Sequence, residues 1–75
     1  MDKFILHIKV HGYNEFNETR ACFMAEVSGL EEAFVSEAET VRAVKDSHVL
    51  CEELYVRSTL MNNNEVVYKH DYQLI

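Results

Sequence analysis

The chain has 75 residues, with 7 Lys and Arg against 13 Asp and Glu, so its formal net charge is −6. This length allows a single domain over residues 1–75 and leaves room for only a thin hydrophobic core. The acidic balance argues against direct nucleic-acid binding, and the apolar runs are too short to span a membrane. We find no secretory signal, so we expect a cytoplasmic protein in which Cys22 and Cys51 are free thiols, with a Cys22–Cys51 disulfide as the alternative.

Residues 4–10 alternate between apolar and mixed positions, which predicts a strand with one buried face. Residues 20–27 alternate in the same way, and we expect Ala21, Phe23, Ala25 and Val27 to point inward. The polar residues 12–18 predict a turn, so the two segments should form an antiparallel hairpin. The side of the hairpin that faces away from the core would carry Ile5, His7, Lys9, His11, Cys22, Met24 and Glu26.

Residues 28–46 show the pattern of an amphipathic helix. Ser28 and Glu31 match a capping box, in which a hydroxyl and a carboxylate cap the first turn. Apolar residues then recur at spacings of three and four, and we expect the helix to end near Asp46. Glu37 falls in the apolar sector, where it either reaches water or a lysine near a sheet edge, or makes a specific salt bridge or partner contact. The predicted stripe is Leu30, Ala33, Phe34, Ala38, Val41 and Val44.

Residues 48–60 predict a long strand, one side of which would carry Val49, Cys51 and Tyr55. Its alternation is broken near residues 51–53, where we expect a bulge or a change of register. Asparagines 62–64 predict a turn, and residues 65–75 predict the last strand. The resulting order β-β-α-β-β predicts an α+β fold, a four-stranded antiparallel sheet with one helix packed on one face.

The side chains that could hold a metal or act as nucleophiles are dispersed. His7 and His11 lie four residues apart, roughly 13 Å along a strand, which is too far for both to bind one zinc ion together with Cys22. Neither cysteine has a cation or a helix N-terminus beside it in the sequence to activate the thiol. We therefore predict no catalytic residue, no metal site and no cofactor.

The remaining candidates for function are carboxylates. One side of the predicted helix presents acidic residues at seven-residue spacing, and two more follow Cys51. We predict that they bind a protein partner with a basic surface, because acidic groups attract basic grooves, including nucleic-acid channels. A solvated helix face with no partner is the alternative interpretation. The predicted contacts are Glu31, Glu32, Glu39 and Asp46, with Glu52 and Glu53 secondary.

Residues 25–33, AEVSGLEEA, lead from the end of a hairpin into an amphipathic helix. This layout resembles small phage and mobile-element inhibitors, such as anti-CRISPR proteins and phage inhibitors of host RNA polymerase. The resemblance covers most of the chain as architecture and only this segment as a pattern. It implies a non-enzymatic inhibitor that blocks a host nucleic-acid-processing or defence complex.

Two alternatives remain from the residues themselves. The first is a structural homodimer or assembly subunit that uses the uncovered sheet face or an edge strand, since pairing would hide both. The second is a small metal or thiol enzyme.

Overall fold

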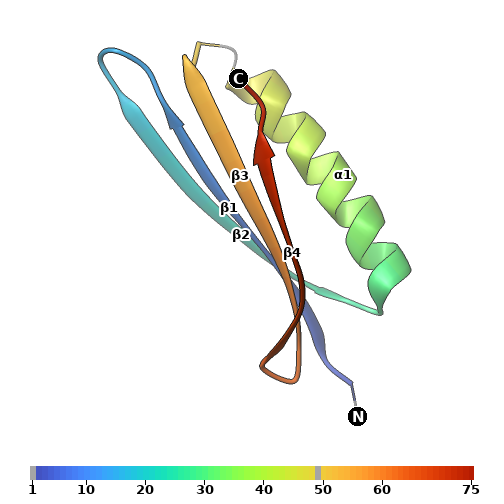
Figure 1. Cartoon of the computed structure of the whole chain (residues 1–75). Coiled ribbons are helices and arrows are strands. Elements are labelled where there is room, and N and C mark those ends of the chain that lie inside the picture. Colours follow the sequence, from blue (N-terminus) through green and yellow to red (C-terminus); the bar gives the residue numbers. More distant parts are fainter. Residues whose placement is uncertain (1, 49) are drawn as a thin grey trace.

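The computed structural model describes residues 2–48 and 50–75, so Val49, which the sequence placed in a strand, lies outside the described residues, as does Met1. The elements are β1 (Phe4–Tyr13), β2 (Glu18–Val27), α1 (Leu30–Ser47), β3 (Glu53–Asn62) and β4 (Glu65–Gln73). The strands form one antiparallel sheet in the order β2-β1-β3-β4, with α1 on one face (Figure 1). The predicted α+β fold and its β-β-α-β-β order are therefore confirmed.

Asparagine side chains and backbones shape both hairpin turns. In the first turn, the Asn14 side-chain oxygen accepts hydrogen bonds from the backbone N–H groups of Phe16 and Asn17, each at 2.9 Å. In the second, Asn63 and Asn64 have φ of 50° and 71°, the left-handed region that asparagine tolerates better than most residues. The turn predicted at the asparagines is confirmed.

The core lies between the central strands and α1. Alternate residues of β1 and β3 point toward the helix and are almost fully buried, as their period-two pattern requires. Within residues 2–48 and 50–75, no helical segment combines the length and the hydropathy that a membrane crossing requires. The buried hydrophobic residues are Leu6, Ile8, Val10, Val27, Ala33, Val44, Leu54, Val56 and Leu60.

The start of α1 differs from the predicted capping box. Gly29 is the N-cap and provides no side-chain hydrogen bond. The Glu32 carboxylate, rather than that of Glu31, turns back and accepts the Ser28 backbone N–H at 2.6 Å. The helix begins one residue later than the pattern assumed, so the carboxylate one position further on reaches the free donor.

The second pair of strands also differs from the prediction. β3 begins at Glu53, and the expected irregularity near residues 51–53 lies before the strand, where the Glu52 N–H donates to the Tyr13 carbonyl at 3.0 Å. Inward and outward residues then alternate regularly along β3. The register shift lies instead between Leu60 and Met61, opposite the start of β4. The broken alternation reflected a late strand start rather than a bulge.

The inner face of the sheet is covered unevenly. Val27 of β2 is buried as predicted, but Ala25 is exposed and Phe23 is 46% exposed. On α1, Leu30, Phe34 and Ala38 of the predicted stripe are exposed as well. The helix packs over β1 and β3, so part of the inward face of β2 remains open to solvent.

Candidate functional site

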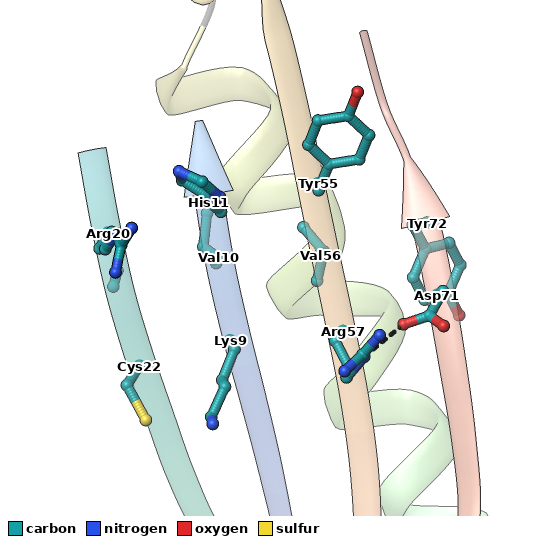
Figure 2. A pocket seen from close by; sticks show the side chains of 11 residues that line it. Lys9, Val10, His11, Arg20, Cys22, Tyr55, Val56, Arg57, Asp71 and Tyr72 are labelled. Atoms are coloured by element: carbon teal, nitrogen blue, oxygen red, sulfur yellow. Dashed lines mark hydrogen bonds and ion pairs between the residues drawn. The ribbon is translucent and has the colours of Figure 1, made fainter. Parts of the chain in front are cut away.

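The sheet face that points away from α1, which we call the outer face, contains a hollow of 710 Å³ (Figure 2). The hollow extends over all four strands, and α1 lies behind the sheet in this view. Side chains at alternating positions of the strands provide its polar lining. They are Lys9 and His11 of β1, Arg20 and Cys22 of β2, Tyr55 and Arg57 of β3, and Asp71 of β4.

The strand register explains why these residues meet. Lys9 lies opposite Cys22 on one side and opposite Arg57 on the other, and Arg57 lies opposite Asp71. Directly opposed residues in antiparallel strands share a face and have Cβ atoms about 5 Å apart. One row of side chains therefore crosses the whole sheet.

Ion pairs hold two of the three cationic side chains of the hollow. Arg57 Nε lies 2.7 Å from Asp71 Oδ1, and Arg20 Nε lies 2.7 Å from Glu18 Oε1. Asp71 raises the pKa of the Arg57 guanidinium, and Arg20 lowers the pKa of the Glu18 carboxyl. Lys9 forms no ion pair with any residue in the described part of the chain, so its ammonium group is available to a ligand.

The hollow differs in charge from the chain as a whole. Its lining has three Lys or Arg side chains and one Asp, and Glu18, which contacts both Arg20 and His11, lies directly beside it. The local charge is therefore +1 at neutral histidine. The whole chain has a net charge of −6. The hollow therefore offers a cationic surface on an acidic protein, and it suits carboxylate or other anionic groups.

His7 and Cys22 are brought together on the outer face. His7 Nε2 lies 2.7 Å from Cys22 Sγ, so the thiol has an imidazole beside it, and the alternation in the sequence had already placed both side chains on the same side of the hairpin. Both cysteines are free, as predicted. Among residues 2–48 and 50–75, no three His, Cys, Asp or Glu side chains are grouped so that they could hold a metal ion.

Aromatic rings border one end of the hollow. The ring of Tyr13 lies 5.2 Å from that of His11 and 6.2 Å from that of Tyr55, measured between centroids. Glu53, opposite Tyr13 in the register, raises the pKa of the Tyr13 hydroxyl and keeps it protonated. The Tyr13 and His11 rings lie against each other across Gly12, next to the end of the hollow that Tyr55 lines.

The structure places the predicted acidic contacts in two groups. Glu31, Glu32, Glu39 and Asp46 are exposed on α1, and we call these four residues the acidic helix side. Glu52 is exposed just before β3, whereas Glu53 is half-buried and lies across from Tyr13. Glu53 therefore belongs to the outer face of the sheet and does not join the acidic helix side.

Glu37 lies inside the protein at the contact between α1 and β4. It is 4% exposed, and its Oε2 accepts hydrogen bonds from the Tyr72 hydroxyl and from His70 Nδ1, the latter at 2.9 Å. The histidine contact is the specific pairing that was one of the two alternatives. Ser58 and Tyr68 complete this group, which we call the Glu37 cluster, and Phe34 stacks on Tyr68 with 5.4 Å between ring centroids.

The electrostatics of the Glu37 cluster favour an ionised carboxylate. Burial raises the pKa of Glu37, but the hydroxyls of Ser58 and Tyr72 and the ring of His70 outweigh that effect and lower it below its ordinary value. The same carboxylate raises the pKa of Tyr72 to about 12, so Tyr72 remains a hydrogen-bond donor. Within the described residues, Glu37 Oε1, Ser58 Oγ and Tyr68 OH are buried without a hydrogen-bond partner of good geometry.

The hollow was missed at the sequence level because its cations come from three strands. Lys9, Arg20 and Arg57 are far apart in the chain. Their proximity can be predicted only if one knows which alternate residues of each strand point to the outer face. Because β3 begins later than predicted, the sequence pattern did not show clearly that the Arg57 side chain points to the outer face. The alternation of β1 and β2 was the available signal, since it already placed Lys9 and Cys22 on one side.

Comparison of the chain with protein-family models, with curated proteins and with solved structures gave no match. The resemblance to phage inhibitors therefore stays a prediction.

Proposed function

We propose that this chain is a non-enzymatic protein-binding module whose outer-face hollow binds an acidic segment of a partner protein. The observation that carries the proposal is the charge of the hollow, +1 from three Lys or Arg against Asp71 and Glu18, on a chain of net charge −6. Lys9 lies in the middle of the row of side chains that crosses the sheet and has no ion pair of its own among the described residues.

The arrangement of the cations supports a short polar segment as the ligand. Glu18 and Asp71 orient Arg20 and Arg57, which lowers the entropy lost when these side chains contact a carboxylate. Tyr55 adds a hydroxyl between the charged residues, and Glu18 holds the His11 ring in place through Nε2 at 2.8 Å. A nucleic acid has one charge per nucleotide along its whole length and would extend over acidic surfaces, whereas a protein segment needs only two or three carboxylates inside the hollow.

A charge-reversal pair tests this proposal. We would measure fluorescence anisotropy of a labelled peptide of alternating Glu and Ser, with a Gln-Ser peptide as the uncharged reference, at about 50 mM salt. Lys9→Glu should weaken binding of the acidic peptide about tenfold. Lys45→Glu, which changes the net charge equally but lies on α1, should change it less than about twofold. Equal losses in both variants, or equal binding of both peptides, would contradict the proposed surface.

The acidic helix side is a second candidate surface, for a partner with a basic groove, as the resemblance to inhibitors implies. It is favoured by the exposure of all four carboxylates, Glu31, Glu32, Glu39 and Asp46. Glu32→Lys combined with Glu39→Lys should abolish binding of a labelled Lys-Ser peptide at low salt while leaving the circular dichroism spectrum unchanged. Glu15→Lys combined with Glu65→Lys is the matched control, and equal affinity in both double variants would rule out the acidic helix side.

A further inference from the structure

The two edges of the sheet differ in regularity. β2 has ten residues, and its ladder with β1 is regular over ten residue pairs, so the other side of β2 presents an equally regular row of backbone N–H and C=O groups. β4 is interrupted by the register shift opposite Leu60 and Met61, and this irregularity makes the β4 edge less suited to pairing with another strand. The chain has no proline, so no proline blocks pairing along β2.

The inner face of β2 is also incompletely covered. Phe23 is 46% exposed and Ala25 is exposed, whereas Leu6 and Ile8 on the neighbouring strand are each 2% exposed. A shallow depression of 150 Å³ lies between β2 and α1, and Phe23, Ala25, Ser36 and Thr40 are among the residues that line it. β2 therefore combines an unpaired regular edge with exposed apolar side chains.

We propose that β2 pairs antiparallel with β2 of a second copy of this chain, about a twofold axis that passes through Phe23. In this register Phe23 lies opposite Phe23 of the other copy, and Ala21 lies opposite Ala25. Arg20 lies opposite Glu26 of the other copy, and symmetry repeats that pair on the other side of the axis. The apolar pairs fall on the inner face and the charged pairs on the outer face.

Charge complementarity selects this register over its neighbours. A twofold axis at Cys22 would place Glu18 opposite Glu26, which is a repulsive pair. An axis at Met24 would place Arg20 opposite Ser28 and Cys22 opposite Glu26, which gives no ion pair. Of these three registers, only the axis at Phe23 brings unlike charges together and like charges nowhere, so a second copy fits the β2 edge without any change in sequence.

The pairing would extend the sheet to eight strands and place both helices on the same side. Arg20 and Cys22 line the hollow at its β2 border, so the hollows of the two copies would become neighbours across the new strand pair. The dimer would present two adjacent cationic hollows on one continuous face. This inference stands on β2 alone and does not depend on what the hollow binds.

The oligomeric state and a charge swap test the proposal together. Sedimentation velocity from about 1 to about 200 μM should show a concentration-dependent dimer for the unaltered chain. Arg20→Glu or Glu26→Arg alone should raise the dimer dissociation constant about tenfold or more. The combined swap should restore it to within about threefold, because unlike charges face each other again. Lys45→Glu should leave it unchanged.

A disulfide trap checks the register in variants that remain folded. With Cys51→Ser as the background, Met24→Cys places the new thiol opposite Cys22 of the other copy. Mild oxidation should give a covalent dimer with a 22–24 disulfide identified by mass spectrometry, and Thr59→Cys, on the outer face of a central strand, should give none. A monomer at every concentration, failure of the swap to restore affinity, or a 22–22 disulfide as the main product would overturn the proposal.

Discussion

Replacement of Glu37 by alanine is expected to remove the polar link between α1 and β4. The carboxylate accepts hydrogen bonds from Tyr72 and from His70, and it is 4% exposed. No other residue of α1 among those described makes a hydrogen bond or ion pair with β4. The variant therefore tests whether a buried charge on α1 holds the edge of the sheet.

The size of the effect follows from the two hydrogen bonds. Loss of a bond to a charged group costs about 1.5–3 kcal/mol, but the partly exposed His70 ring can be solvated again, and the desolvation cost of the carboxylate disappears. We expect a net loss of about 2 kcal/mol in the free energy of unfolding. A domain of 75 residues has a total stability of about 4–11 kcal/mol, so this loss is easily measured.

Urea unfolding followed by circular dichroism at one protein concentration provides the assay. Glu39→Ala, an exposed carboxylate of the same helix, is the matched control and should change stability by less than about 0.5 kcal/mol. A double-mutant cycle with Tyr72→Phe should give a coupling energy of about 1 kcal/mol. Equal effects of Glu37→Ala and Glu39→Ala, or additive effects of the Glu37 and Tyr72 variants, would refute the reasoning.

The remaining predictions concern pH, a close contact and a turn. The folded protein lowers the pKa of Glu37 below its ordinary 4.5, so the unfolded chain binds the proton first on acidification. The advantage of the unaltered chain over Glu37→Gln should be full above about pH 5.5 and should shrink in urea titrations toward about pH 3. Gly12→Ala places a methyl group 2.9 Å from Cys51 Sγ and 3.0 Å from Leu54 Cδ1, and it should cost about 1–3 kcal/mol of unfolding free energy. Gly29→Ser has open space at the N-cap of α1 and should be neutral or stabilising by about 0.5 kcal/mol, so equal losses at the two glycines in a thermal melt would contradict the packing argument. Asn64→Val should cost about 1–2 kcal/mol because a β-branched residue tolerates a φ of 71° poorly, while Asn64→Gly should not destabilise. A Val variant as stable as the Gly variant would show that the turn adopts another conformation.

The elements were predictable from the sequence because they depend on local periodicity. Alternation identified β1 and β2, and the asparagines identified the second turn, whose backbone needs residues that tolerate positive φ. The capping of α1 was not predictable to the residue, because Glu31 and Glu32 both stand in the first turn and the choice between them depends on the angle at which the chain enters the helix.

Properties that depend on long-range placement could not be predicted. The sequence marked Glu37 as unusual, but its partners His70 and Tyr72 are 33 and 35 positions away and meet it only after β4 joins the sheet. To predict the hollow, one would likewise need to know, for all four strands together, which residues point to the outer face. Its residues lie on the outer face, where no packing constraint fixes their identity, so no apolar pattern in the sequence points to them.

The width of the helix explains why the two edges of this sheet have different chemistry. Neighbouring strands are about 4.8 Å apart, and a helix with its side chains is about 10 Å across, so one helix covers roughly two strands. In this fold those two are β1 and β3, whose inward residues are the most buried. On the β4 side, the Glu37 cluster and the stacked rings of Phe34 and Tyr68 close the remaining gap within the same chain. On the β2 side no comparable group of described side chains covers Phe23 and Ala25. In this fold the inward side of β2 is the part of the sheet left open, and its regular ladder and opposite charges are the reasons for which we propose a second copy beside it.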